Sequence, residues 1–278
     1  FKLSIFALGT NTPRSNFGYS DANTFGLNNE SNFNNGRWWE DVNPNISNGI
    51  PRTFRTGFYF SDQISKKIKL GANYTYSNNE LESISDRASQ YFLSDTTYYT
   101  EDLGSNYQKN ESHRLNLNIN IKLDSLSNLE ISPKYIQNSE TFLNNDSTRF
   151  INQEGQLNSY TKIFNSSRTE YQTISNEIVL KKRFKKEKRE LRLTIKNSFT
   201  ENYDSTYLNS LNNFQNAPTI FNDTTDQKQE QRTENQNHSA LISFKEPFWK
   251  LFTINTEYFF KYINNRQIKK TNDFNSIS

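Results

Sequence analysis

Hydrophobic and polar residues alternate along His113–Leu123, the clearest extended segment of the chain. One set of alternate positions holds Leu115, Leu117, Ile119, Ile121 and Leu123, and the other holds Arg114, Asn116, Asn118, Asn120 and Lys122. Successive side chains of a β-strand point to opposite faces of its sheet, whereas a helix would scatter these residues around its axis. The segment therefore predicts a strand with one hydrocarbon face and one face of amides and charges.

The same period of two recurs eight more times. It is strong in Arg52–Ser61, Lys67–Ser77, Glu190–Thr200 and Lys250–Tyr262, and weaker in Lys2–Leu8, Asn128–Asn138, Arg168–Phe184 and Gln231–Lys245. Ile136, Val179 and Leu241 break the pattern, because they fall on the polar face of their segments. We predict about nine strands in an all-β, antiparallel up-and-down meander.

The expected connections alternate between short and long. Short links are predicted at Asp62–Lys66, Asp124–Ser127, Lys185–Arg189 and Glu246–Phe248, and long loops at Gly9–Pro51, Asn78–Ser112, Ser139–Ser167 and Glu201–Glu230. Such loops are rare in compact soluble domains, but outer-membrane barrels combine short periplasmic turns with long extracellular loops. We therefore expect part of an incomplete transmembrane β-barrel in a bacterial outer membrane, in contact with its lipid.

Composition agrees with this expectation. The chain has a mean hydropathy of −0.93 and no apolar run near the roughly 18 residues that a membrane helix needs, but a barrel strand crosses with about 10 alternating residues. Its aromatic content of 14% argues against disorder. The net charge of +3 is too balanced for nucleic-acid binding, and the absence of Cys excludes a disulfide framework.

The polar positions of the strands are the candidate lumen-facing residues. They are Arg55, Asn73, Arg114, Asn116, Asn118, Glu130, Arg192, Lys196 and Glu257. We expect residues 1–278 to form one piece of a barrel domain, since the chain begins at Phe1 without an initiator Met or a signal peptide. Strands from outside this sequence would then pair with its two free edges.

No motif predicts catalysis, a cofactor or a metal site, so we do not expect an enzyme. His113 and His238 each begin a strand and are expected at a membrane interface rather than in acid–base or metal chemistry. The basic run Lys181–Arg189 is expected to be a solvated turn, with lipid headgroups as a secondary contact, rather than a nucleic-acid site. Loop carboxylates, namely Glu80, Glu82, Asp86, Asp223 and Asp226, match no calcium-loop spacing.

Aromatic residues near the strand ends suggest the girdles that barrels carry at both membrane interfaces. They are Tyr59, Phe60, Tyr74, Tyr76, Tyr258, Phe260 and Tyr262. Sugar stacking stays open for Trp38, Trp39, Tyr91, Tyr98 and Tyr99, which are expected in loops.

Three segments of the sequence resemble the outer membrane β-barrel family related to TonB-dependent receptors. Gly57–Asn79 resembles that family's first hairpin, Gln90–Tyr99 is similar to its loop, and His113–Asn118 with Lys122–Pro133 resembles its next hairpin. The resemblance covers about Gly57–Asn138. It implies a receptor or transporter with an upstream plug domain and a TonB-type energy-coupling partner, and this sequence contains neither a plug nor a TonB box.

Three rival functions follow from these observations. The first is uptake of an unidentified solute, the second an outer-membrane barrel with a structural, adhesion or secretion role, and the third a soluble all-β binding module. A plug and a TonB box upstream would favour uptake over the second function, and solubility without detergent would favour the third. No sequence motif distinguishes among a siderophore, a glycan, a peptide and a vitamin as the solute.

Overall fold

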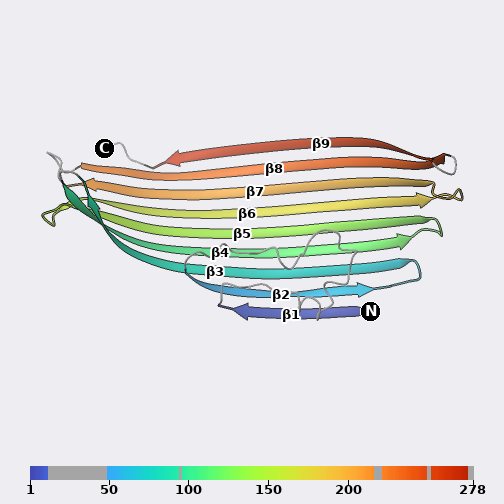
Figure 1. The fold of residues 1–278 in the computed structure, drawn as a ribbon, viewed down its shortest axis with the longest axis horizontal. Coiled ribbons are helices and arrows are strands. Elements are labelled where there is room, and N and C mark those ends of the chain that lie inside the picture. The colour runs from blue at the N-terminus through green and yellow to red at the C-terminus, as the bar shows by residue number, and fades with distance from the viewer. Residues whose placement is uncertain (12–48, 94–95, 216–220, 249–251, 275–278) are drawn as a thin grey trace.

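The computed structural model describes residues 1–11, 49–93, 96–215, 221–248 and 252–274 as one antiparallel sheet of nine strands (Figure 1). The strands are β1 (Lys2–Thr10), β2 (Ile50–Asp62), β3 (Ile68–Phe92), β4 (Thr97–Lys122), β5 (Ser127–Ile151), β6 (Leu157–Arg183), β7 (Glu190–Phe214), β8 (Phe221–Phe248) and β9 (Phe252–Asp273). Each strand pairs with the next in sequence order. The predicted nine-stranded meander is therefore confirmed, and the described residues contain no helix.

Three of the four predicted long loops are wrong. The segments Asn78–Ser112, Ser139–Ser167 and Glu201–Glu230 continue the strands as paired ladders, as far as the ends of β3 to β8. Most of the fourth, Gly9–Pro51, lies outside the described residues. These extensions carry polar residues on both faces, so they show no hydrophobic period, although the backbone pairing and cross-strand polar contacts hold them in strand conformation. In one such contact, the Thr148 hydroxyl donates to the Asp102 carboxylate at 2.8 Å.

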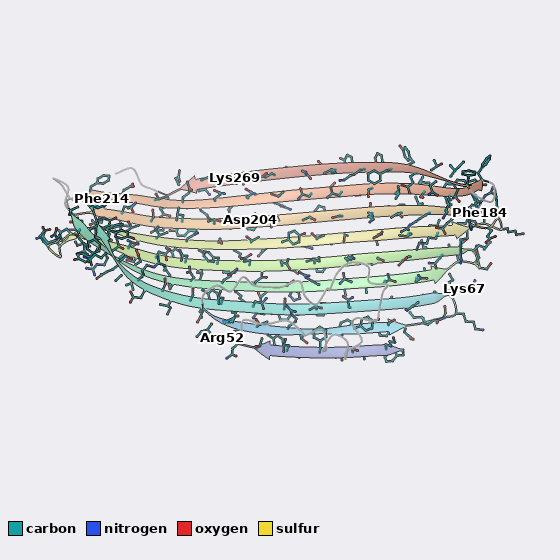
Figure 2. The ribbon with its side chains drawn as sticks, in the orientation of Figure 1. Arg52, Lys67, Phe184, Asp204, Phe214 and Lys269 are labelled. Atoms are coloured by element: carbon teal, nitrogen blue, oxygen red, sulfur yellow. The ribbon has the colours of Figure 1, made fainter. Side chains whose placement is uncertain are left out.

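Short links join the strands at one end of the sheet, which we call the turn end. They occupy residues 63–67, 123–126 and 184–189, close to the predicted positions. The fourth prediction is wrong, because Glu246–Phe248 belongs to β8 and the link that follows lies outside the described residues. Figure 2 shows Lys67 and Phe184 at the turn end and Phe214 at the opposite end, which we call the far end.

The described sheet is a single open layer. β1 pairs only with β2 and β9 only with β8, so each outer strand keeps one unpaired edge among the described residues. All of β9 is exposed, including Phe252 at 64% and Tyr258 at 67%. A strand edge presents unpaired backbone N–H and C=O groups that favour pairing with another strand.

On β2 and β3, burial is inverted relative to a water-soluble sheet. In β2 the alternate residues Arg55 and Tyr59 are only 2% and 3% exposed, whereas Phe54 and Phe58 on the other face are 46% and 37% exposed. Asn73 on β3 is the most completely buried large side chain, at 1%. Large apolar side chains normally occupy the interior and amides the surface, so this arrangement requires an explanation.

Candidate functional site: a polar face and an apolar belt

All nine candidate lumen-facing residues lie on the same face of the sheet, which we call the polar face. Directly paired residues on neighbouring strands lie on the same face, so the register can be followed from strand to strand. Asn73 pairs with Asn116, and Arg114 pairs with Ile136. Arg192 pairs with Ser243, which in turn pairs with Glu257. The predicted exceptions Ile136, Val179 and Leu241 also lie on this face. The alternation in the sequence therefore assigned the faces of the six strands that carry these nine residues consistently.

Amides and charges of the polar face contact one another across the strands. The Asn116 amide donates to the Asn73 carbonyl oxygen at 2.7 Å, and the Asn118 amide donates to the Ser132 hydroxyl at 3.2 Å. Lys196 lies 3.4 Å from the Glu177 carboxylate. These contacts offset part of the desolvation cost of covering the groups that they join, although the Asn73 side-chain nitrogen is buried without a hydrogen-bond partner among the described residues.

Over β6 to β9 the polar face contains a shallow hollow of about 590 Å³. Three predicted residues, Arg192, Lys196 and Glu257, line it, and Leu241 and Phe259 contribute an apolar patch. Ser243 donates a hydrogen bond of 3.2 Å to Glu257. Sequence reasoning identified the charges and flagged Leu241, but it could not place them together, because they lie on three strands.

On the opposite face, which we call the apolar face, hydrocarbon side chains form continuous rows across the strands. One row runs through directly paired residues from β3 to β9: Leu70, Ile119, Ile131, Ile178, Ile195, Ala240 and Phe260. The next row towards the turn end is Ile68, Ile121, Leu129, Leu180, Leu193, Ile242 and Tyr258. The two rows share the direct pairing of seven strands, so they form a band rather than scattered patches.

We call this band the apolar belt and define it by its extent on each strand. It comprises the apolar-face residues of Phe54–Phe60, Ile68–Tyr76, Leu115–Ile121, Leu129–Tyr135, Ile174–Leu180, Leu191–Phe199, Ala240–Phe244 and Tyr258–Tyr262. Seven residues, such as Leu115–Ile121, span roughly 20–24 Å along a strand. Asn176 and Asn197 interrupt the belt near its far-end margin on β6 and β7, and His238, opposite Asn197, lies just beyond that margin on β8.

Beyond the belt, towards the far end, the same face changes to ion pairs. Arg168 lies 2.6 Å from Glu170, and Arg232 lies 2.7 Å from Glu201 and 3.1 Å from Glu234. Lys109–Glu111 and Lys228–Glu230 are equivalent pairs on β4 and β8, at 3.1 Å and 2.7 Å. The hydrocarbon is therefore continuous only over the part of the strands nearest the turn end, and beyond it single apolar side chains such as Ile84 and Leu103 lie among the charges.

The belt crosses the strands obliquely. Direct pairing links Phe58 on β2 through Tyr74, Leu115, Tyr135, Ile174 and Phe199 to Gln236 on β8. The midpoint of the belt lies at Gly57 on β2, one residue before Phe58, but at Ile242 on β8, six residues beyond Gln236. From β2 to β8 the midpoint thus moves by seven residues towards the turn end, with three of them in the step from β2 to β3 and none between β4 and β6. On β9 the midpoint, Phe260, pairs with Ala240 and lies two residues back towards the far end.

Aromatic and histidine side chains mark the far-end margin of the belt. His113 lies two residues before Leu115, with its Nδ1 2.8 Å from the Tyr74 hydroxyl and its ring 4.8 Å from the Tyr76 ring. His238 lies two residues before Ala240, with its Nδ1 2.9 Å from the Asn197 carbonyl oxygen. The two histidines therefore occupy equivalent places. Of the predicted girdle residues, Phe60, Tyr74, Tyr76, Tyr258, Phe260 and Tyr262 lie on the apolar face and Tyr59 on the polar face.

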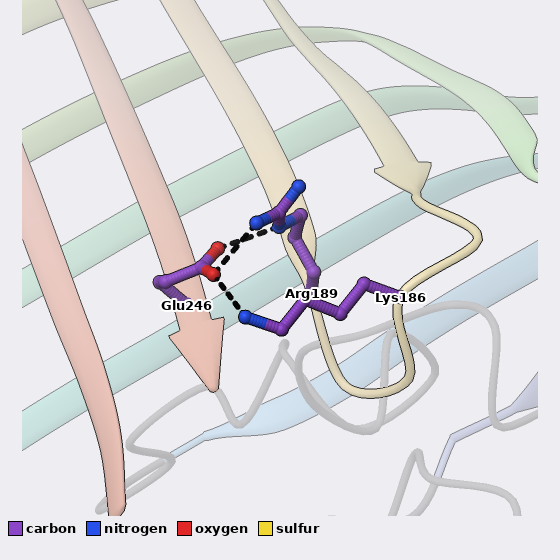
Figure 3. A network of polar contacts seen from close by, with 3 residues as sticks. All are labelled: Lys186, Arg189 and Glu246. Carbon is purple, nitrogen blue, oxygen red and sulfur yellow. Dashed lines mark hydrogen bonds and ion pairs between the residues drawn. The ribbon is translucent and has the colours of Figure 1, made fainter. Parts of the chain in front are cut away.

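At the turn end, Glu246 of β8 holds the basic link between β6 and β7 (Figure 3). Arg189 donates to both carboxylate oxygens, from Nε at 2.6 Å and from a terminal nitrogen at 2.7 Å, and Lys186 donates at 2.6 Å. These charge-assisted hydrogen bonds hold the pKa of Glu246 at about 2, below its usual value. The Arg189 guanidinium also lies over the Phe184 ring. The sequence predicted the turn, but not this cross-hairpin contact.

Residues expected in loops lie in strands or outside the described residues. Glu80, Glu82 and Asp86 are on β3, and Asp223 and Asp226 are on β8. Tyr91 and Tyr98, at the far end, stack with ring centroids 4.7 Å apart, and Tyr99 follows on β4, whereas Trp38 and Trp39 lie outside the described residues. Within the described part of the chain, no group of three His, Asp or Glu residues is placed to hold a metal ion.

Comparison with known proteins adds no relative to this picture. No protein family, no curated protein and no solved structure matches the chain. Among the described residues, no helix is long and apolar enough to span a bilayer. The arrangement of side chains on the two faces is therefore the basis for assigning a function.

Proposed function

We propose that this chain is part of an outer-membrane β-barrel receptor or transporter of the TonB-dependent type. One observation carries the membrane part of the proposal, namely exposed hydrocarbon on one face of the sheet and amides and charges on the other, with Arg55 and Asn73 buried on that polar face. Lipid would cover the apolar belt, and the polar face would surround a wet interior or a plug. A transmembrane barrel requires this distribution, because its outer surface contacts hydrocarbon and its lumen contacts water.

The oblique course of the belt supports the same proposal. A displacement of seven residues is about 24 Å along the strands, and six strand spacings are about 29 Å across them. A flat bilayer would meet such a belt evenly if the strands were tilted by about 40° from the membrane normal. Closed transmembrane barrels have tilts of roughly 35–45°. A sheet packed against a soluble partner has no equivalent reason to displace its apolar stripe by about one residue per strand.

The ion-paired half of the sheet supports an orientation. The strands continue from the belt to the far end with charges on both faces, so this half would stand in water outside the bilayer. Outer-membrane barrels place their longer projections on the extracellular side. The short links would therefore face the periplasm, and the far end would meet external solutes.

The transport part of the proposal rests on the resemblance of Gly57–Asn138 to barrels related to TonB-dependent receptors. Solute uptake would need a plug and an inner-membrane energy source from outside this sequence. Growth of a deletion strain on defined nutrients tests this part, and growth equal to the parent on every nutrient would favour a structural, adhesion or secretion role.

Site-directed spin labelling tests the membrane part, because the chain has no Cys to replace first. Labels at Ile119→Cys and Ile195→Cys should collide with oxygen dissolved in lipid, and labels at Asn118→Cys and Lys196→Cys with a water-soluble nickel complex. Neighbouring positions 118 and 119 serve as matched controls for local structure. Equal access of both reagents to the two faces, or a detergent-free soluble monomer, would contradict the proposal.

The same labels test the tilt. If direct strand pairing is followed from His113 on β4 across to β8, the position reached is Glu234. His238 lies four residues beyond Glu234 towards the turn end, so the two histidines are four residues apart in register. A tilt of about 40° displaces four strand-to-strand steps by about 16 Å, and four residues along a strand span about 14 Å. Labels at His113→Cys and His238→Cys should therefore report equal bilayer depths. A difference of about 10 Å would refute the oblique belt as a membrane boundary.

A further inference from the structure

Positive charge gathers at the turn end of the sheet. The segments 61–69, 122–128, 181–192 and 243–248 contain thirteen Lys and Arg residues against five Asp and Glu residues, a net charge of +8, whereas the whole chain has +3. The rest of the chain is therefore net negative. Six of the thirteen cations, including Arg192, lie on the polar face, and the links with the apolar-face margin hold the other seven against four carboxylates. At the far end, cations and carboxylates are mixed, so the charge is segregated along the strands.

Each turn-end link also carries a large apolar side chain beside its cations. Ile64, 59% exposed, is next to Lys66 and Lys67 in the link between β2 and β3. Leu123, 46% exposed, follows Lys122. The half-buried Phe184 precedes Lys185, and Phe248, 59% exposed, ends β8. Exposed hydrocarbon is costly in bulk water, but neighbouring apolar and basic side chains suit the boundary between acyl chains and headgroups.

The apolar belt continues directly into this basic region. Lys182 lies on the apolar face, opposite Leu191 and two residues beyond Leu180, at the turn-end margin of the belt. Its aliphatic stem can cover hydrocarbon while its ammonium group reaches the headgroup layer. A lipid that covers the belt therefore places its headgroup among the turn-end cations.

Some of these cations are held by the protein and others are available. Glu246 binds Arg189 and Lys186 and thereby fixes the link between β6 and β7. Lys182, Lys185 and Lys188 are exposed, and none of them has a carboxylate within ion-pair distance among the described residues, although Lys182 interacts electrostatically with Asp124. The fixed link thus presents Lys185 and Lys188, and the end of β6 presents Lys182, beside the end of the belt.

We propose that the turn end binds the anionic phospholipid headgroups of the leaflet that surrounds it, rather than standing free in water. This inference rests on the proposed membrane insertion, but it adds a lipid specificity that insertion does not require. Anionic headgroups would supply counter-charge for the cations of the links and of the apolar-face margin, and the side chains of Ile64, Leu123, Phe184 and Phe248 would lie at headgroup depth. Each Lys or Arg near an anionic membrane surface strengthens binding to anionic over neutral lipid by up to about fivefold.

The test uses the full chain in vesicles of mixed phosphatidylcholine and phosphatidylglycerol. Spin-labelled forms of the two lipids measure which one associates with the protein. We expect a preference of at least fivefold for phosphatidylglycerol, weakened by salt. The triple variant Lys182→Gln, Lys185→Gln and Lys188→Gln should remove most of the preference.

A matched variant, with Arg87, Arg149 and Lys162 changed to Gln in the far half of the strands, loses the same charge and should keep the preference. Equal loss in both variants, or an undiminished preference in the turn-end variant, would overturn the proposal. Binding of soluble polyglutamate without a preference for phosphatidylglycerol would also overturn it, and would point to an acidic protein partner. Insertion without any lipid preference contradicts only this inference, whereas failure to enter either neutral or anionic bilayers contradicts the membrane proposal itself.

Discussion

A single charge placed on either face of β4 gives the sharpest test of the inverted sheet. Ile119 lies in the middle of the apolar belt, between Leu70 on β3 and Ile131 on β5. Its neighbour Asn118 points to the polar face, where its amide contacts Ser132 and lies 3.5 Å from Glu130. The two positions are neighbours on one strand at nearly the same depth, so the main difference between them is what covers each face.

The expected magnitudes follow from this geometry. Lys in place of Ile119 should destabilise the folded protein by about 2–4 kcal/mol, the range for a cation near the midplane of a barrel's lipid face. That corresponds to roughly 30- to 900-fold in the folding equilibrium. Lys in place of Asn118 would meet Glu130 and water, so its effect should stay within about 0.5 kcal/mol. Ser139, on the same face as Ile119 but opposite Glu111, lies beyond the belt, and its replacement by Lys should cost about 0–1 kcal/mol.

Urea titration of folding into lipid vesicles, followed by fluorescence of the three Trp residues, measures these differences. The free energy of unfolding should fall far more for Ile119→Lys than for Ser139→Lys. For Asn118→Lys it should stay close to that of the unchanged protein. Equal costs at Ile119 and Asn118 would refute the assignment of the two faces. A cost at Ser139 as large as at Ile119 would refute the position of the belt boundary.

Two further predictions concern packing and acid stability. A Cβ at Gly57 would collide with the Tyr74 carbonyl oxygen and come within 2.7 Å of the Phe6 ring, so Gly57→Val should cost about 1–3 kcal/mol in the same titration. Gly9→Val, where nothing lies within 4 Å, should change the free energy of unfolding by no more than about 0.5 kcal/mol, and similar costs at both glycines would contradict this packing. The pKa of Glu246 is depressed to about 2, so its contacts with Arg189 and Lys186 should stabilise the fold fully above a pH of about 4.3, the usual pKa of a glutamate. This stabilisation should be lost as the pH falls towards 2. Hydrogen exchange at the Phe184 amide, which donates to the Arg189 carbonyl, should show this loss in the unchanged protein and not in Glu246→Gln.

Local alternation was sufficient to predict the strands and their faces. Leu115 to Leu123 repeat with a period of two, and that period fixes which side chains share a face wherever the segment is extended. The same reasoning placed all nine candidate residues, from Arg55 to Glu257, on one face, although it could not show which of them meet. It failed where both faces are polar, as in Asn78–Ser112, because a ladder held by backbone pairing and polar contacts leaves no hydrophobic period to read.

The sequence by itself determined the number of strands, their antiparallel order and the chemistry of each face, since these depend on neighbours along the chain. Only the tertiary structure decided the register between strands. Register aligns Leu70, Ile119, Ile131, Ile178 and Ile195 into one row, displaces the apolar belt by about one residue per strand, and brings Glu246 to Arg189. The physical reason is that cross-strand pairing is set jointly by turn geometry and by the burial of whole faces, neither of which a single segment contains.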